Sequence, residues 1–134
     1  FIDNQPCFVH GRGELLEPIH VSLQGQHVVI IHPGIHVSTA EAYKGIKPKP
    51  APFDLRTIQQ LPREQWQHVV TNDFEDSVCV QHPAISTLIE QLIQEGAWCA
   101  RMSGSGSAVF AFFDKRVELT NIPADCFCSW GTVL

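Results

Sequence analysis

The stretch that decides the fold is ARMSGSGSAVFAFF (residues 100–113), in which a loop of alternating serine and glycine separates two apolar runs. The run after the loop, residues 108–113, reads as a buried strand. Walker-type and Rossmann-type phosphate loops both lead into a helix, whose N-terminus holds the phosphate. The spacing also fails the Rossmann fingerprint, because the loop has only Gly104 and Gly106. The loop is therefore expected to lead into a strand rather than to open a phosphate-binding helix.

Residues 103–107 have two interpretations. The first is a β-hairpin turn that uses glycine for positive φ angles. The second is a backbone nest, in which several N–H groups and serine hydroxyls hold or brace an anionic group. An ordinary hairpin needs only one or two glycines, so the absence of large side chains from Ser103 to Ser107 favours close approach by another group. The pattern alone leaves both interpretations open.

Strands are expected on both sides of this loop and at the start and end of the chain. The clearest is HVVIIHP, with four consecutive β-branched residues from Val28 to Ile31. Two short strands are expected around a turn at Gly11, Arg12 and Gly13. All the expected strands lie within residues 7–11, 13–19, 27–33, 97–103, 107–113 and 125–134.

Helices are expected between the third and fourth of these strands. Ser38 followed by Glu41 is a capping-box pattern, which predicts a short helix from Ser38 or Thr39 to about Gly45. The best helix is residues 83–95, where Ile85, Leu88, Ile89, Leu92 and Ile93 share one face. Weaker helices are expected at residues 55–61, 63–69 and 72–78. The pattern predicts an α+β domain: an antiparallel sheet with helices packed on one face.

Composition sets the class of protein. The chain has 134 residues, enough for one domain with a real core, and a formal net charge of −5. An acidic balance argues against a nucleic-acid or anionic-membrane partner, and no apolar run has the length of a membrane span. The chain starts at Phe1, inside what reads as a strand, so it is expected to be a fragment of a longer protein.

Five cysteines are present, an odd number that buried free thiols in a reducing cytoplasm explain best. Cys126 and Cys128 have the wrong spacing for a zinc knuckle, and their side chains are expected to point to opposite faces of a strand. His32 and His36 flank a Pro-Gly break, so they do not predict a zinc site either. No metal site is predicted.

Two charged features have alternative interpretations. Asp73, Glu75 and Asp76 form an acidic run that reads as a solvated helix start, with a magnesium role as the less typical alternative. Arg101 adjoins the serine-glycine loop, where it would either reach a phosphate or form an ion pair at a strand edge.

Three segments together resemble the GHMP kinases, the small-molecule kinases named for galactose, homoserine, mevalonate and phosphomevalonate. They are FIDNQPCFVHGRGELLEPI (residues 1–19), HPGIHVSTAEAYKGI (residues 32–46) and MSGSGSAVFAFF (residues 102–113). The closest likeness is to the branch that acts on 4-diphosphocytidyl-2-C-methyl-D-erythritol in non-mevalonate isoprenoid precursor synthesis. The resemblance covers essentially the whole chain.

The resemblance implies a ferredoxin-like C-terminal, substrate-side domain of an ATP-dependent kinase that phosphorylates the 2-hydroxyl of that cytidine-diphosphate substrate. It implies that Tyr43 stacks on the cytosine ring and that Thr39 binds substrate. The turn that borders the cytidine would be Gly11, Arg12 and Gly13; position 12 is commonly apolar in the family, which leaves the role of the Arg12 side chain undefined. The motif that packs against the ATP loop would be Met102, Ser103, Gly104, Ser105 and Gly106.

The resemblance also implies that parts of the catalytic machinery lie outside residues 1–134. The catalytic base is expected upstream of Phe1, so no catalytic residue is assigned to residues 1–134. ATP and Mg²⁺ would be bound mainly by an N-terminal domain of the same enzyme, and the isolated chain is expected to be inactive. Two alternatives stay open: another GHMP kinase, of the homoserine or mevalonate type, and a non-catalytic ferredoxin-like binding domain.

Overall fold

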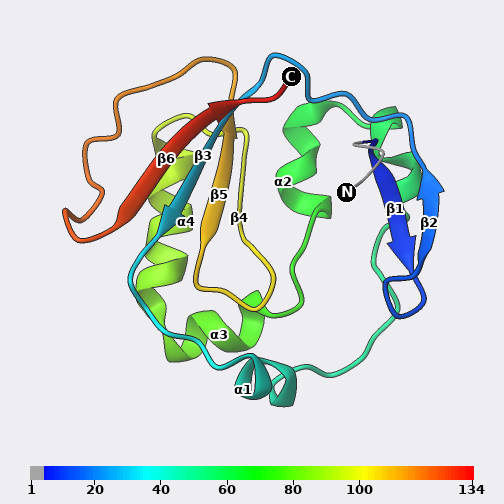
Figure 1. Ribbon diagram of the computed structural model, residues 1–134, viewed down its shortest axis with the longest axis horizontal. Coiled ribbons are helices and arrows are strands. Elements are labelled where there is room, and N and C mark those ends of the chain that lie inside the picture. Colours follow the sequence, from blue (N-terminus) through cyan, green and yellow to red (C-terminus); the bar gives the residue numbers. More distant parts are fainter. Residues whose placement is uncertain (1–4) are drawn as a thin grey trace.

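The structure, a computed structural model, describes residues 5–134 (Figure 1). Helices and strands alternate in blocks, as the sequence predicts. In chain order the elements are β1 (Cys7–His10), β2 (Leu15–Pro18), β3 (His27–His32), α1 (Thr39–Lys44), the 3₁₀ helices η1 (Leu55–Gln60) and η2 (Arg63–Gln65), α2 (Trp66–Val69), α3 (Glu75–Gln81), α4 (Pro83–Gln94), β4 (Cys99–Met102), β5 (Val109–Phe113) and β6 (Phe127–Thr132).

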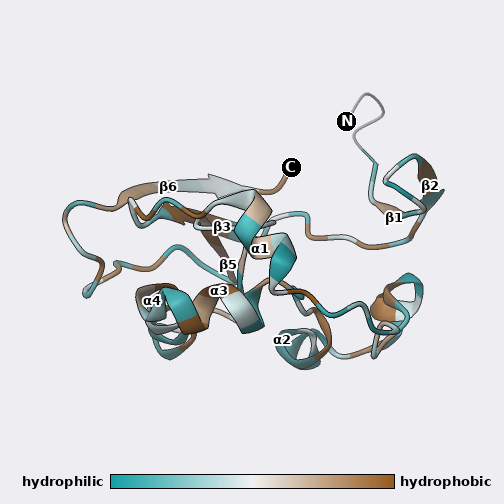
Figure 2. Ribbon diagram, turned by 90° about the horizontal axis from the view of Figure 1, so that it is seen from below, coloured by the Kyte–Doolittle hydropathy of each residue, from teal (hydrophilic) through white to brown (hydrophobic). Residues whose placement is uncertain are grey.

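Four strands form the main sheet, in the order β4-β5-β3-β6, and every neighbouring pair is antiparallel. The β-branched run makes β3 a central strand, with Val29 opposite Ala111 on one side and Trp130 on the other. Figure 2 shows α3 and α4 on the same side of this sheet. The expected α+β architecture, an antiparallel sheet with helices packed against it, is confirmed.

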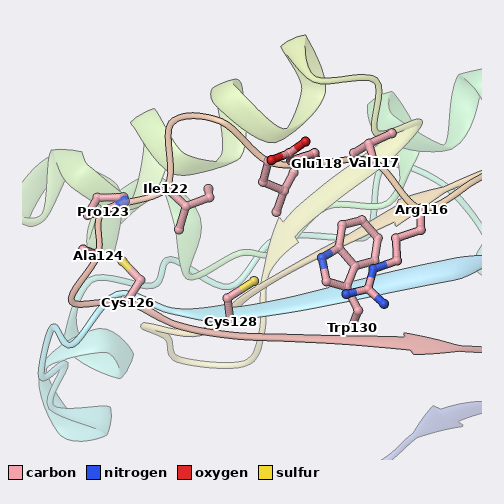
Figure 3. A pocket seen from close by; sticks show the side chains of 10 residues that line it. Arg116, Val117, Glu118, Ile122, Pro123, Ala124, Cys126, Cys128 and Trp130 are labelled. Atoms are coloured by element: carbon pink, nitrogen blue, oxygen red, sulfur yellow. The ribbon is translucent and has the colours of Figure 1, made fainter.

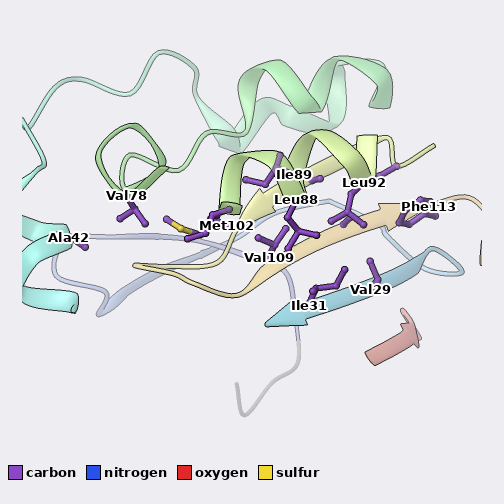
Figure 4. Close-up of a cluster of buried hydrophobic side chains, with 14 residues drawn as sticks. Val29, Ile31, Ala42, Val78, Leu88, Ile89, Leu92, Met102, Val109 and Phe113 are labelled. Carbon is purple, nitrogen blue, oxygen red and sulfur yellow. The ribbon is translucent and has the colours of Figure 1, made fainter. Parts of the chain in front are cut away.

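Helix α4 provides most of the helical side of the core. Pro83 occupies its first turn, and Gly96 follows its end with a φ of +101°. The helix buries one apolar stripe against the alternate, inward residues of β3 and β5 (Figure 4). The buried residues are Ile85, Leu88, Ile89 and Leu92 from α4, and Val29, Ile31, Val109, Ala111 and Phe113 from the strands.

The two N-terminal strands pair with each other, as expected, but in a separate two-stranded sheet (Figure 1). This hairpin packs beside η1 rather than on the main sheet. The Arg56 guanidinium lies 5.3 Å from the centre of the Phe8 ring and 3.7 Å from a Glu17 carboxylate oxygen. The antiparallel pairing was predictable from local sequence, whereas the separation from the main sheet was not.

The weaker helices differ from expectation in type and extent. Residues 55–60 form a 3₁₀ helix, and residues 63–69 divide between a 3₁₀ turn and the short helix α2. The helix expected over residues 72–78 begins only at Glu75, because the Asn72 side-chain oxygen accepts a hydrogen bond from the Phe74 N–H and forms a turn first.

The loop between β5 and β6, residues 114–126, runs beside β6 along the edge of the sheet and borders an open hollow of about 620 Å³ (Figure 3). Cys126 and Cys128 both line it, so the expectation that they lie on opposite faces is wrong. The reason is that strand alternation places residues i and i+2 on the same face, so two cysteines separated by one residue point to the same side.

All five cysteines are free thiols. Cys99 is buried, as expected, but Cys128 is exposed because β6 is an edge strand of the sheet. Within residues 5–134, none of the helices has the length and apolar character needed to cross a membrane.

Candidate functional site

The glycine loop, residues 103–107, connects β4 to β5 in an antiparallel hairpin in which Met102 pairs with Val109. The hairpin interpretation is therefore correct for the topology. Gly104 and Gly106 have φ angles of +55° and +87°, a region that favours glycine. The Met102 thioether packs beneath Gly106, where an added Cβ would meet its sulfur at 2.7 Å.

Main-chain donors in this loop divide into two kinds. The Ser103 N–H donates to the Ala108 carbonyl at 2.7 Å, and the Gly106 N–H donates to the Ser103 carbonyl at 3.0 Å. Within residues 5–134, by contrast, the N–H groups of Gly104 and Ser105 donate to no protein acceptor. The loop is thus a hairpin that also offers two free donors, the feature that a nest requires.

Helix α1 brings Thr39 to this loop. The Ser38 hydroxyl caps the helix by accepting a hydrogen bond from the Glu41 N–H, as the capping box predicts. Thr39 Oγ1 then lies 3.2 Å from Ser105 Oγ, within hydrogen-bond distance. This contact joins the second and third of the segments that the sequence singled out.

Tyr43 lies one helical turn after Thr39 and is 64% exposed, so it is not buried against the sheet. Its ring meets the Phe74 ring edge-on, with 5.0 Å between centroids. Both rings line an open hollow of about 510 Å³, together with Ser103 and Gly104 of the glycine loop. An exposed aromatic beside a hollow with free N–H donors can stack a planar ring and bind an anionic group.

The strap, residues 70–75, runs from the end of α2 to the first residue of α3, and its residues 70–74 form another wall of the same hollow. The Asn72 side-chain amide donates to the Met102 carbonyl at 2.8 Å and to the Gly104 carbonyl at 2.9 Å. Glu75 Oε1 accepts from the Met102 N–H at 2.7 Å. Sequence reasoning missed the contribution of Asn72. The available signal was an asparagine three residues before a helix, a residue type that favours turns and caps.

The expectation of a solvated acidic run holds for Asp73 and Asp76, whose side chains are 54% and 86% exposed. It is wrong for Glu75, whose side chain is only 18% exposed and lies 3.7 Å from Arg101. Burial raises the pKa of Glu75 above its ordinary value, while the Met102 N–H and the Arg101 charge act in the opposite direction. Arg101 also donates to the carbonyls of Val70 and Gln67, which fastens the strap to β4. Of the two interpretations of Arg101, the ion pair is the one that the structure contains.

The predicted turn at Gly11, Arg12 and Gly13 is not brought to this hollow. It forms the tip of the β1–β2 hairpin, on the far side of the molecule from β6 (Figure 1). The Arg12 N–H donates to the Glu14 carboxylate at 2.5 Å, and Arg12 itself is exposed.

The larger hollow of Figure 3 contains none of the predicted site residues, whereas the smaller one is lined by Tyr43, Met102, Ser103 and Gly104. We take the smaller hollow as the candidate site, because an exposed aromatic and a loop with free main-chain donors meet there. Residues 5–134 hold no group of three or more His, Cys, Asp or Glu side chains arranged to bind a metal ion.

Curated relatives share this sequence over almost its full length. A protein of Bacteroides thetaiotaomicron named 4-diphosphocytidyl-2-C-methyl-D-erythritol kinase is 39% identical over 133 residues, which are 98% of this chain and 48% of the relative. A protein of Cytophaga hutchinsonii with the same name is 43% identical over 119 residues, 88% of this chain and 44% of the relative. The chain therefore spans about half the length of the curated relatives it matches.

Solved structures share the fold. A crystal structure of 4-(cytidine 5'-diphospho)-2C-methyl-D-erythritol kinase superimposes with a TM-score of 0.60 at 23% identity, covering 83% of this chain and 41% of that one. A homoserine kinase from Cytophaga hutchinsonii gives a TM-score of 0.50 at 18% identity, covering 95% of this chain and 48% of that one. The family described as GHMP kinases C terminal matches residues 52–127, a segment that includes the strap and the glycine loop. The chain belongs to the GHMP kinase C-terminal family.

Proposed function

We propose that this chain is the substrate-side half of a cytoplasmic, ATP-dependent kinase that phosphorylates the 2-hydroxyl of 4-diphosphocytidyl-2-C-methyl-D-erythritol. The proposal rests on the family, on relatives that carry that name, and on one geometric observation. That observation is the 3.2 Å contact between Thr39 and Ser105, which holds the glycine loop beside the exposed ring of Tyr43.

Tyr43 is proposed to stack on the cytosine ring. Its ring is exposed on one side and supported edge-on by Phe74, so it offers a flat apolar surface that needs little reordering. Stacking of a base on an aromatic side chain contributes about 1–3 kcal/mol of binding free energy. Thr39 is proposed to contact a polar group of the same substrate through its hydroxyl, which is already ordered by Ser105.

The glycine loop is proposed to face the phosphoryl group in transit. Phosphoryl transfer depends mainly on positioning and on stabilisation of negative charge. The N–H groups of Gly104 and Ser105 are fixed by the hairpin, so they need not reorganise as charge develops. Loss of one such donor typically raises the activation barrier by about 2.7–4 kcal/mol.

The remaining machinery is assigned to the half of the parent kinase that this chain does not include. ATP supplies the phosphoryl group and Mg²⁺ neutralises its charge when bound. The metal has no fitting donor set within residues 5–134. The catalytic base and the ATP loop are assigned to the same missing half.

The test uses the full-length kinase and measures ADP release with 4-diphosphocytidyl-2-C-methyl-D-erythritol, homoserine and mevalonate as separate acceptors. We expect turnover with the cytidine substrate alone. Tyr43→Ala should raise KM for that substrate by about 5- to 100-fold, and Tyr43→Phe should not. Turnover with homoserine or mevalonate instead would favour another kinase type, and no turnover with any acceptor would favour a non-catalytic binding domain.

Residues 1–134 expressed alone provide a second arm of this test. The proposal places the base and the ATP loop elsewhere, so the isolated chain should show no turnover. Measurable activity of this chain without the rest of the kinase would contradict that division of labour.

A further inference from the structure

The strap holds the glycine loop through contacts that the proposed function does not itself use. Asn72 contributes three hydrogen bonds: its amide nitrogen donates to the carbonyls of Met102 and Gly104, and its oxygen accepts from the Phe74 N–H. The carboxamide is therefore fixed at both ends, between the start of α3 and the loop. A side chain held in this way cannot rotate without breaking all three bonds.

The direction of the Gly104 carbonyl fixes the direction of a neighbouring donor. The Gly104–Ser105 peptide is trans, and in a trans peptide the C=O and N–H groups point to opposite sides. When Asn72 draws the Gly104 carbonyl toward the strap, the Ser105 N–H must point away from it. This is one of the two loop N–H groups with no protein acceptor within residues 5–134.

The strap itself is anchored to the sheet. Glu75 accepts from the Met102 N–H, and Arg101 donates to the Val70 carbonyl at 2.6 Å. Gln67, just before the strap, accepts from the Ala100 N–H at 2.9 Å. These bonds connect both ends of the strap to β4, so Asn72 projects from a rigid support. Small errors in placement of a group at a reacting centre cost large factors in rate.

We infer that Asn72 is a positioning residue for phosphoryl transfer, one that directs the Ser105 N–H away from the strap by holding the Met102 and Gly104 carbonyls. This inference rests on the proposed function for its catalytic meaning. Its structural part, the control of the loop by Asn72, stands on the hydrogen bonds alone. The Ser105 N–H is proposed to interact with charge that develops only in the transition state, so loss of Asn72 should lower kcat rather than weaken substrate binding.

The decisive variant is Asn72→Asp in the full-length kinase. The aspartate keeps an oxygen for the Phe74 N–H but has no hydrogen to donate to the two carbonyls. Asn121→Asp is the matched control, since Asn121 lies in the loop between β5 and β6 and, within residues 5–134, its side chain donates only to the Thr120 hydroxyl. We expect Asn72→Asp to lower kcat by about 10- to 100-fold with KM for the cytidine substrate within about twofold, and the control to change neither.

A second readout separates this inference from the proposed function. Hydrogen exchange in residues 103–107 should accelerate in Asn72→Asp while β3 and β5 keep their protection. If the wild-type kinase shows no turnover, the proposed function fails, and this exchange measurement still decides the role of Asn72. If Asn72→Asp does not fold, Asn72→Ser, which is neutral and too short to reach both carbonyls, is measured by the same criteria.

Two results would overturn the inference: unchanged loop exchange, or a kcat within about twofold of wild type, whether or not KM rises.

Discussion

Thr39 and Ser105 lie 66 residues apart in the sequence, yet their hydroxyl oxygens are 3.2 Å apart. The contact joins the first turn of α1 to the tip of the β4–β5 hairpin. Because Tyr43 follows Thr39 by four residues, the two side chains lie on the same helical face. One hydrogen bond therefore sets the position of an exposed aromatic ring relative to the free main-chain donors of the glycine loop.

Replacing Thr39 tests this relationship. Thr39→Val keeps the shape and removes the hydroxyl, which leaves the exposed Ser105 hydroxyl to water. A typical hydrogen bond contributes about 0.5–1.5 kcal/mol, so kcat/KM of the full-length kinase should fall by about 3- to 10-fold. Thr39→Ser retains the hydroxyl and should restore most of the loss. Equal losses in both variants would show that the methyl group, and not the hydrogen bond, is what matters.

The two loop glycines should differ in their tolerance of alanine. Gly104 and Gly106 both have positive φ angles, which cost an alanine about 1–2 kcal/mol. A Cβ at Gly104 meets nothing within 4 Å, whereas one at Gly106 meets the Met102 sulfur at 2.7 Å. Overpacking adds about 1–3 kcal/mol, so Gly106→Ala should lower the free energy of unfolding more than Gly104→Ala. Denaturant unfolding of the full-length protein measures both, and the reverse order would contradict the close packing at Met102.

Local sequence patterns predicted much of this fold because they indicate which face of each helix or strand is buried. The 3.6-residue period of α4 and the β-branched run of β3 each specify one apolar surface, and those surfaces meet in the core. The capping box at Ser38 likewise specified the start of α1 from two residues. What these patterns do not contain is pairing between distant elements. For that reason the sequence did not predict that the β1–β2 hairpin stands apart from the main sheet.

The site was predicted in part, for the same reason. Thr39, Tyr43 and the glycine loop came from segments with distinctive composition, and the structure places them together. Asn72 and Glu75 looked like ordinary residues of a polar stretch. Their importance arises from tertiary hydrogen bonds to Met102, a residue 27 positions from Glu75 and 30 from Asn72. Such contacts leave no local signal in the sequence.

Cys99 should be the least reactive of the thiols at mildly alkaline pH. Burial raises its pKa to about 11 from an ordinary value of 9.0, and the side chain is 3% exposed. Labelling of the folded protein with iodoacetamide at about pH 8.5, read by mass spectrometry, should modify the exposed Cys128 and spare Cys99 until denaturant is added. Equal labelling of the two thiols in the native protein would show that β4 is not packed as described.

Because its pKa is raised, Cys99 contributes to the free energy of unfolding in a way that depends on pH. The folded thiol stays neutral above the pKa of the unfolded one, so its contribution is complete below pH 9.0 and is lost as pH rises toward 11. The loss is at most about 3 kcal/mol. Cys99→Ala has no thiol to titrate, so its free energy of unfolding lacks this dependence. Between pH 9.0 and 11, the free energy of unfolding of wild type should therefore fall relative to that of Cys99→Ala. A difference that stays constant would place the folded pKa of Cys99 near its ordinary value.

Glu75 gives a test at acidic pH. It shows whether burial or the interactions with Met102 and Arg101 have the larger effect on its pKa. Burial raises its pKa above the ordinary 4.5, whereas the Met102 N–H and Arg101 lower it, and burial is the largest of these influences. A raised folded pKa means that the contribution of Glu75 is complete below pH 4.5 and declines as pH rises through the folded pKa. Glu75→Gln keeps an oxygen for the Met102 N–H but does not titrate. The unfolding free energy of wild type should therefore fall relative to Glu75→Gln as pH increases from about 4 to 7. If wild type gains relative stability over that range instead, the ion pair with Arg101 outweighs burial, and the strap is held by charge rather than by a neutral hydrogen bond.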